Sequence, residues 1–310
     1  MTMARVDEQG ELDELEARLL IMLPATYQGR DEDVLPVSMG SADLKYGSDG
    51  KVAWDEIWGS FCDLAMAGGP PHKGKLLEPG RIEEIDAEAD RYRDVVKEIC
   101  RGIALVTGLY AEQSSNPGWI KMHCTSAAMA GWLARAVVME NVSANFRGLG
   151  LYLPAGPHYR LEKEIKNVVT VVAKTSHYWL EHSSPEQHDA VARLFVTLDS
   201  ESPLVQPLPF GYEAQEDRQR ELSSKIASAL LESTGLLALE QFYDGWLGLN
   251  CGDVRAAIWM MRVLVVSNVF ARREEMVVFV PVNPVSDPDG KTVVRAVVRT
   301  HRLAVAQKIL

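Results

Sequence analysis

Apolar side chains recur at helical spacing in several stretches of the chain, and these stretches predict most of its secondary structure. Ile57, Phe61 and Leu64 lie on one helical face and predict a helix over 54–67. Residues 186–197 follow the same pattern and predict its counterpart later in the chain. The first predicted helix is therefore one of a pair.

Two longer helices have recognisable ends. Residues 83–108 begin with acidic side chains, which suit the positive end of a helix dipole, and they end at Gly108. Residues 213–235 repeat this pattern and end at Gly235. Glycine is frequent just after a helix because it adopts the left-handed conformation at little cost.

A third pair of helices is predicted over 119–140 and 246–267, and both are apolar nearly all round, which is typical of buried helices. Asparagine, which also tolerates the left-handed conformation, follows each helix at Asn141 and Asn268. A short apolar strand is predicted next in each case, at 149–153 and 276–280.

The closing segments, 165–180 and 291–305, are ambiguous. β-Branched residues fill 168–172, and the later segment alternates with period two after an Asp289-Gly290 turn signal, so we favour strands and a hairpin. A helix is the alternative, because three arginines of the later segment also share one helical face: Arg295, Arg299 and Arg302.

The first part of the chain, residues 1–53, predicts a β unit of two or three strands. A turn is expected over 47–50, before an apolar run that begins at Val52. The run from Leu20 to Ala25 is similar to the predicted strands that end in proline at Pro154 and Pro281.

The chain resembles itself when its first half is aligned with its second. Aligning 90–157 with 217–284 without a gap gives 20 identities in 68 positions, against about four expected from average composition. The identities include two pairs of tryptophan, a rare residue: Trp119 with Trp246, and Trp132 with Trp259. This similarity predicts an internal duplication.

We therefore predict an α+β fold in which two pseudo-two-fold-related helical cassettes are interleaved with β-hairpin-like units. The expected parts are an N-terminal β unit (1–53), a first copy (54–180) and a second copy (181–310). One cassette leaves an apolar face uncovered, so two copies are expected to cover each other as the halves of a homodimer do. No linker rich in glycine, serine or proline separates them, which favours one compact body.

Composition and charge restrict the class of protein. The 310 residues include 47% hydrophobic and 24% charged side chains, as globular proteins do. The net charge of −11 argues against a nucleic-acid partner, because non-specific binding to nucleic acid needs an excess of lysine and arginine. Four widely spaced cysteines are too few for a disulfide scaffold, so we expect reduced thiols.

The distribution of charge argues against targeting to a membrane. The start of the chain is acidic, whereas a signal peptide begins with basic residues. The apolar runs 127–139 and 256–271 each carry an arginine near the middle, which is costly in lipid. We expect a cytoplasmic protein without a membrane partner, and the sequence does not indicate its oligomeric state.

The segment 67–75, AGGPPHKGK, occurs in the first copy only and is the best candidate for binding chemistry. Its glycines allow close approach of the backbone, and its cations form a positive cluster in an acidic chain: Gly68, Gly69, His72, Lys73 and Lys75. A phosphate or carboxylate would suit this cluster, with His72 as the proton-transfer candidate. The segment lacks the P-loop pattern, and a rigid surface turn with solvated lysines is the commoner structure for such a sequence.

Two arginines lie within the apolar third helices. Arg135 and Arg262 each need a partner, because an unpaired buried charge is costly. We favour structural pairing, and the alternative is that both arginines converge on an anionic ligand. Asp43 and Lys45 stand among small residues and are candidates to line a cleft with the 67–75 segment.

His123 and Cys124 form a further pair with catalytic potential. Adjacent helical residues point about 100° apart, so the two would not form a dyad with each other. Cys124 is a candidate nucleophile with a histidine from elsewhere. Because Cys251 repeats it in the second copy, we favour a packing role.

These observations lead to one functional hypothesis and two alternatives. The first is a cytosolic enzyme of small-molecule metabolism that acts on an anionic substrate, bearing phosphate or carboxylate, at the interface of two pseudo-symmetric halves. The second is a non-catalytic accessory or assembly protein that presents a pseudo-dimeric binding surface. A weaker alternative is a metal-dependent enzyme that uses histidines near 177–188. No dinucleotide, kinase, zinc-finger or EF-hand motif is present, so the sequence assigns no cofactor and no metal site.

Overall fold

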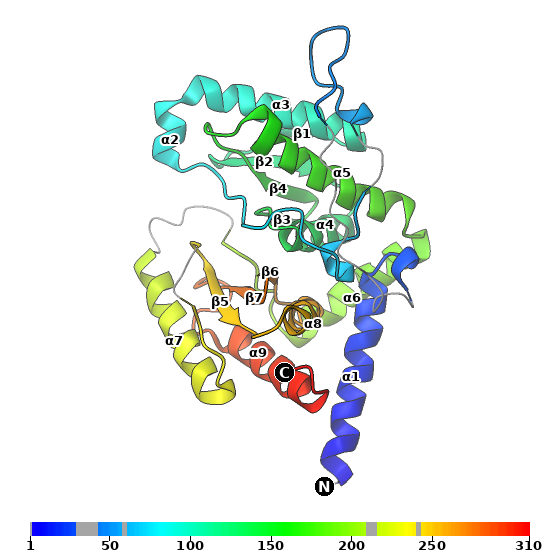
Figure 1. The fold of residues 1–310 in the computed structure, drawn as a ribbon, viewed down its shortest axis with the longest axis vertical. Helices are drawn as coiled ribbons and strands as arrows, with labels where there is room; N and C mark the ends of the chain where they lie inside the picture. The colour runs from blue at the N-terminus through cyan, green and yellow to red at the C-terminus, as the bar shows by residue number, and fades with distance from the viewer. Residues whose placement is uncertain (1, 29–42, 58–60, 209–215, 240–242) are drawn as a thin grey trace. The chain divides into compact units, whose positions relative to one another are not determined.

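The chain divides into two compact units (Figure 1). Unit 1 joins Met1–Pro24 to Pro185–Leu310, and unit 2 comprises Ala25–Ser184. A computed structural model describes residues 2–28, 43–57, 61–208, 216–239 and 243–310. Both units combine helices with an antiparallel sheet, so the predicted α+β class is confirmed. Within these described ranges, no helix has the length and apolar character needed to cross a membrane.

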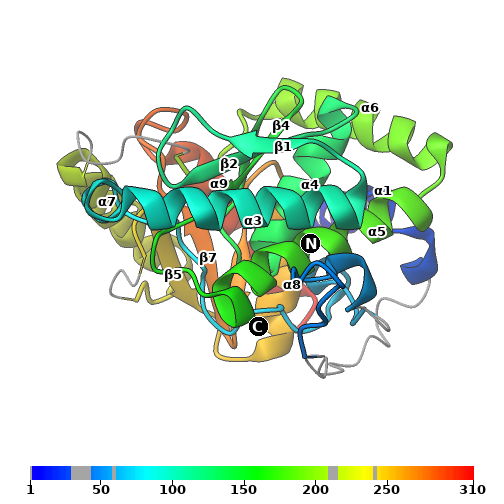
Figure 2. The ribbon, with the colours of Figure 1, turned by 90° about the horizontal axis from the view of Figure 1, so that it is seen from above.

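Unit 2 is built from a four-stranded sheet and four α-helices among its described residues. The strands, in the order β1-β2-β4-β3, are β1 (Ala111–Gln113), β2 (Trp119–His123), β4 (Gly150–Pro154) and β3 (Asn145–Arg147). The helices are α2 (Ile82–Ala87), α3 (Ala89–Thr107), α4 (Ala127–Met139) and α5 (Lys166–Glu181). Helix α3 packs against α5 and against β1, and Figure 2 shows its long axis beside the sheet.

Unit 1 has a three-stranded sheet and five α-helices in the part of it that the structure describes. The strands, in the order β5-β7-β6, are β5 (Trp246–Asn250), β7 (Val277–Pro281) and β6 (Arg272–Glu274). The helices are α1 (Thr2–Met22), α6 (Pro185–Glu201), α7 (Glu216–Thr234), α8 (Val254–Val265) and α9 (Lys291–Ala306). Helices α7 and α8 both pack against α9, and α1 contacts α6.

Strand pairing follows the same register in both units. Trp119 lies opposite Pro154 in the β2–β4 pair, and Trp246 lies opposite Pro281 in the β5–β7 pair. The alignment of 90–157 with 217–284 places β2, β3 and β4 on β5, β6 and β7, with the same first and last residue in each case. The offset between the two aligned segments of the sequence is thus also the offset between corresponding strands.

Side-chain caps define where the central buried helices begin. The Ser126 hydroxyl accepts a hydrogen bond from the Met129 N–H (3.0 Å), and the Asp253 carboxylate accepts one from Ala256 (3.3 Å). The predicted helices 119–140 and 246–267 were therefore too long, because their first residues form β2 and β5. Their predicted ends are confirmed, since left-handed asparagines follow: Asn141 (φ 60°) and Asn268 (φ 63°).

The predicted strands at 165–180 and 291–305 were wrong, because α5 and α9 occupy these segments. All five residues of 168–172 are buried, so the run packs on every side of α5. Periodicity does not distinguish such a helix from a buried strand. Gly290, expected in a hairpin turn, instead precedes α9 with a φ of 72°.

Two further sequence predictions were wrong. The strand expected near Leu20 is the end of α1, and the described part of 1–53 shows only one antiparallel bridge, between Tyr46 and Val52. The turn predicted at 47–50 is confirmed. The helix expected over 54–67 is replaced by short 3-10 turns, Trp54–Glu56 and Ala65–Ala67, on either side of 58–60, which lie outside the described residues.

The second of these turns shows why an α-helix does not form here. The Leu64 N–H donates to the Tyr27 hydroxyl (3.1 Å), and the Ala65 N–H donates to the Glu140 carboxylate (2.9 Å). Side chains from other segments therefore satisfy backbone groups that a helix would have paired internally. The companion prediction, a helix over 186–197, is confirmed by α6.

The chain passes between the units twice, and each unit joins its own two crossing segments. In unit 2, the Ala25 N–H donates to the His182 carbonyl (3.1 Å). In unit 1, the Gln187 side-chain amide donates to the carbonyls of Ile21 and Leu23. The two ends of unit 2 are therefore neighbours, and so are the two ends at which unit 1 is interrupted.

Arg272 occupies an aromatic enclosure in unit 1. Its side chain is fully buried, and it lies 2.7 Å from the Glu274 carboxylate. Its guanidinium carbon stands over three rings, with centroid distances of 4.0 Å to Phe279, 4.4 Å to Tyr243 and 5.1 Å to Trp246. Cation–π attraction and the carboxylate thus offset the cost of burying the guanidinium.

Candidate functional site

Glu140 fixes the 67–75 loop to the end of α4. One carboxylate oxygen accepts a hydrogen bond from the His72 N–H (2.8 Å), and the other accepts from Ala65 (2.9 Å). The Glu140 carbonyl accepts from the Lys73 N–H (3.2 Å). The loop thus has a defined course, as expected of a rigid turn, and it presents His72 and Lys73 from a fixed backbone.

A buried lysine from α5 balances the charge of Glu140. Lys174 Nζ lies 2.8 Å from Glu140 Oε1, and it donates to the Asp63 carbonyl (2.8 Å) and to Cys62 Sγ (3.1 Å). Burial lowers the pKa of Lys174, but Glu140 and Cys62 together outweigh burial and leave the pKa above its usual value. The lysine therefore remains charged beneath the loop.

The second residue of α5 orients His72. His72 Nε2 lies 3.1 Å from Asn167 Oδ1, a contact that favours the tautomer protonated at Nε2, with Nδ1 as the nitrogen that can accept a proton. Burial lowers the pKa of His72 despite the nearby Glu140. A neutral imidazole with a fixed tautomer is suited to accept a proton at neutral pH.

The side chain of Lys73 lies among charges from the segment that precedes α5. Its pKa is lowered by burial, raised by Glu164, and lowered again by Lys163 and Arg160. Arg160 binds Glu164 through two nitrogens, at 3.2 and 3.1 Å, and Lys163 Nζ lies 4.0 Å from the same carboxylate. Arg160 and Lys163 therefore adjoin the Glu164 carboxylate, and Lys73 lies within electrostatic range of all three side chains.

Glu164 remains ionised within this group. Burial raises its pKa, but hydrogen bonds and charge from Arg160 outweigh burial and bring the pKa down to about 2. At neutral pH the four side chains carry a net positive charge, in a chain whose total charge is −11. We call Lys73, Arg160, Lys163 and Glu164 the cationic cluster.

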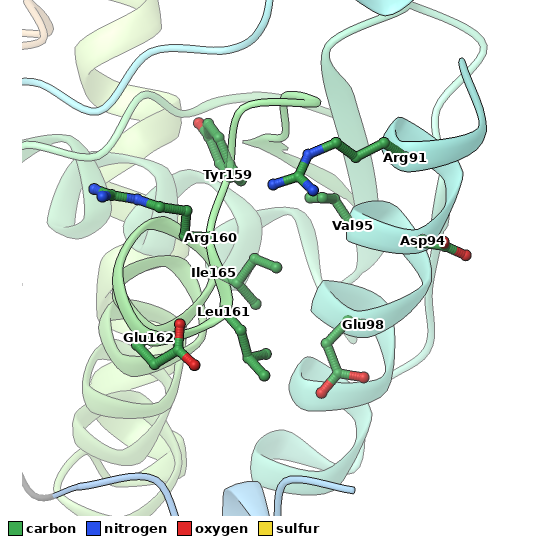
Figure 3. A pocket seen from close by; sticks show the side chains of 9 residues that line it. All are labelled: Arg91, Asp94, Val95, Glu98, Tyr159, Arg160, Leu161, Glu162 and Ile165. Carbon is green, nitrogen blue, oxygen red and sulfur yellow. The ribbon is translucent and has the colours of Figure 1, made fainter. Parts of the chain in front are cut away.

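A groove of about 520 Å³ lies between α3 and the segment that carries the cluster (Figure 3). Figure 3 shows the Arg91 guanidinium extending from α3 toward Tyr159, while Arg160 extends to the other side of its own segment. The groove is lined by Arg91, Asp94, Val95, Glu98, Tyr159, Arg160, Leu161, Glu162 and Ile165. Arg160 belongs to both the groove and the cationic cluster, so the two adjoin.

The segment between groove and cluster is a single turn of π-helix, Leu161–Ile165. π-Helical turns are rare and occur frequently at functional sites. The connection from β4 to α5 is two residues longer than the connection from β7 to α9 in unit 1, and the π-helix lies in this longer connection. The irregular turn is therefore a feature of unit 2.

The corresponding connection in unit 1 has only acidic charged side chains, whereas the connection in unit 2 has two cations and two carboxylates. Residues 284–290 contain two aspartates and no lysine or arginine. Asp287 is buried, and its carboxylate accepts hydrogen bonds from the N–H groups of Thr292 and Val293 (both 3.0 Å), at the start of α9. This carboxylate serves as a helix cap, whereas the connection in unit 2 carries Arg160 and Lys163 beside Glu162 and Glu164.

The glycines of the 67–75 loop have structural roles. Gly68 ends the turn Ala65–Ala67 with a φ of 103°, which only glycine adopts readily. A Cβ at Gly69 would lie 2.6 Å from the Asp63 carbonyl oxygen. Lys75 is exposed to solvent. Of the predicted ligand-binding residues of this loop, Lys73 is the one that belongs to the cationic cluster.

The arginines of the buried helices lie in different units. Arg135 of α4 is buried in unit 2, donates to the Gly131 carbonyl (3.0 Å) and stands over the Phe146 ring at 5.8 Å. Arg262 is buried in α8 of unit 1. The Arg135 contacts are of the structural kind that the sequence favoured.

The remaining predicted residues have other surroundings. His123, on β2, lies 2.8 Å from Glu112 of β1. Cys124 is buried, and burial raises its pKa to about 12, which favours a packing thiol over a nucleophilic thiolate. Asp43 is exposed, and Lys45 Nζ donates to the Glu56 carbonyl (2.6 Å).

The sequence did not point to four residues that the structure brings forward: Glu140, Lys174, Arg160 and Lys163. The sequence held one signal for Glu140, because Ser267 stands at the aligned position of the later segment. Across the described parts of the chain, no three histidine, cysteine, aspartate or glutamate side chains form a metal-binding group. Comparison with family models, curated proteins and solved structures finds no match to the chain.

Proposed function

We propose that the two units descend from one duplicated ancestral unit, and that unit 2 has acquired a binding site for a small anionic molecule. The duplication is supported by 20 identities in 68 aligned positions and by the matching registers of the β2–β4 and β5–β7 pairs. A site present in one copy only is then a later specialisation, because elements shared by both copies serve the common fold.

The cationic cluster carries this proposal. Lys73 comes from the loop fixed by Glu140, whereas Arg160 and Lys163 come from the π-helical segment. Arginine presents a planar set of donors that matches carboxylate and phosphate, and lysine adds a compact charge. Glu164 accepts hydrogen bonds from Arg160 within the cluster, and the charge of Glu162 also acts on Arg160.

The adjoining groove gives the rest of such a molecule a place to bind. Its wall offers apolar surface at Val95, Leu161 and Ile165 and one further cation at Arg91. It also carries three carboxylates, those of Asp94, Glu98 and Glu162. The anionic group would contact the cluster through Arg160, which borders both features. We therefore propose a phosphate- or carboxylate-bearing metabolite, as the sequence suggested, with the site placed within unit 2.

His72 supplies the catalytic part of the proposal. Its neutral imidazole stands next to Lys73 on the fixed loop and has a basic Nδ1. A substrate held by the cluster would give up a proton to this nitrogen, which makes the protein an enzyme of small-molecule metabolism. Simultaneous replacement of His72 and Lys73 by alanine is expected to abolish turnover of any substrate found.

Calorimetric titration of the full chain with inorganic phosphate and with pyrophosphate at low ionic strength tests the binding step. Lys73→Gln and Lys163→Gln should each weaken binding by about tenfold, since a hydrogen bond to a charged group contributes about 1.5–3 kcal/mol. Lys225→Gln is the matched control, because Lys225 is an exposed lysine paired with Glu221 in unit 1. Equal affinity in all three variants, or no binding by the native chain, would overturn the proposal.

A further inference from the structure

Two histidines face each other at the end of α5, outside the cationic cluster. His177 Nε2 and His182 Nε2 lie 3.1 Å apart. The two rings are 4.8 Å apart between centroids and are inclined by 72°, so both nitrogens point toward the same small region. The rings come from the last turn of the helix and from its C-terminal cap.

The separation of these nitrogens matches the spacing of two ligands on one metal ion. With metal–nitrogen bonds of about 2.0–2.1 Å, two imidazoles at a right angle have nitrogens about 2.9 Å apart, and two at the tetrahedral angle about 3.3 Å apart. The observed 3.1 Å lies between these values. An ion therefore fits between the histidines with little movement of either ring.

A carboxylate orients one of the two imidazoles. His177 Nδ1 lies 3.3 Å from Glu181 Oε2, one helical turn away. A proton on Nδ1 that is donated to this carboxylate leaves the lone pair of Nε2 directed at His182. Metal-binding histidines are commonly oriented in this way, and the carboxylate also makes the ligand nitrogen more basic.

Aromatic neighbours limit the movement of both imidazoles. The Phe61 ring lies 5.1 Å from that of His177, and the Tyr178 ring lies 5.2 Å from that of His182. The side chain of His177 is 29% exposed, which leaves it accessible to an ion from solvent. The negative end of the α5 dipole, at the same place, also favours a cation.

We propose that His177 and His182 bind one divalent transition-metal ion of the zinc, nickel and copper class. Imidazole nitrogens suit these metals, whereas magnesium and calcium prefer oxygen ligands. Water would fill the other coordination positions, because the described residues provide no cluster of three ligands. Structural zinc sites use four protein ligands, so an ion held by two is exchangeable.

Calorimetric titration of the full chain with zinc, nickel and copper ions tests this site, with histidine NMR signals as a second readout. One equivalent should bind, and it should be lost in His177→Ala, in His182→Ala and in the milder His177→Gln. Glu181→Gln should weaken binding by about 10–100-fold, as loss of an orienting carboxylate does.

His158→Ala is the matched control, because His158 also lies beside a carboxylate, that of Glu84 at 3.6 Å. The ring of His158 contacts Tyr159, whereas the ring of His177 contacts a second histidine. Phosphate affinity should stay unchanged in the His177 variants, which separates this site from the cationic cluster. Saturable binding that survives both alanine substitutions, or no saturable binding by the native chain, would overturn the proposal.

Discussion

The Lys174 ammonium lies 2.8 Å from the Glu140 carboxylate, and neither side chain is reached by solvent. Glu140 also binds the backbone of the 67–75 loop at His72 and the backbone of the preceding turn at Ala65. One buried charge pair therefore connects α4, α5 and the loop that carries part of the proposed site.

Removing one member of this pair should destabilise the protein strongly. Lys174→Met and Glu140→Gln are each expected to lower the free energy of unfolding by about 3–5 kcal/mol, because each leaves a buried polar group without its partner. Urea denaturation measures the effect. The double variant should lose much less than the sum of the two single losses, and strictly additive losses would show that the two charges are not coupled.

Stability should fall in mild acid because of His72. Its pKa is lowered in the folded protein, first of all by burial, from an ordinary value of 6.5. Below pH 6.5 the unfolded chain therefore binds a proton that the folded chain takes up less readily. The stabilising contribution is present above pH 6.5 and is lost as the pH falls through the folded-state pKa.

His72→Gln should flatten this part of the profile of unfolding free energy against pH. His301 also has a lowered pKa, caused by burial, so His301→Gln serves as a comparison within unit 1. An unchanged slope in the His72 variant would contradict the prediction.

Alanine substitutions at two glycines of unit 1 distinguish the energetic cost of backbone strain from that of steric overlap. Gly290 and Gly235 have nearly the same conformation, with φ values of 72° and 75°. A Cβ at Gly290 would lie 2.5 Å from Ile226 Cγ1, whereas a Cβ at Gly235 would meet no atom within 4 Å. Gly235→Ala should cost about 1–2 kcal/mol, the penalty of the left-handed conformation.

Gly290→Ala should cost more than Gly235→Ala, by about 1–3 kcal/mol, which is typical of overpacking. Thermal or urea unfolding of the two variants under one set of conditions measures the difference. Equal losses of unfolding free energy in the two variants would mean that Ile226 of α7 moves aside at no cost. The close approach of Gly290 to α7 would then not affect stability.

Arg272 should be hard to replace by any other cation. Arg272→Met removes the partner of Glu274 and the charge beneath three aromatic rings, so we expect a loss of about 3–5 kcal/mol. Arg272→Lys should be intermediate, because lysine keeps the charge but not the planar stacking surface. Urea unfolding of both variants would show this order, and a methionine variant as stable as the native chain would contradict it.

The sequence predicted the repeated elements better than the segments between them. Self-comparison aligned 90–157 with 217–284, and Asn141 and Asn268 marked the ends of helices that the structure confirms. These signals are local, since a left-handed residue is required wherever a helix ends in this way.

The errors arose where distant contacts override local preference. The β-branched residues 168–172 predicted a strand, but they lie in α5, where all of them are buried. The cationic cluster was missed because Arg160 and Lys163 reach Lys73 only through the fold, about 90 residues apart in the sequence. Ser126 and Asp253 could have shown where strand gives way to helix, since both are favoured capping residues.

The two crossings of the chain make unit 2 an insertion within unit 1. Because Gln187 binds the carbonyls of Ile21 and Leu23, the cut ends of unit 1 would remain close together if 25–184 were excised. A short turn could then close the gap. Residues 25–184, which carry both proposed sites, could thus be replaced by another domain, in evolution or by design. The backbone of unit 1 would remain continuous.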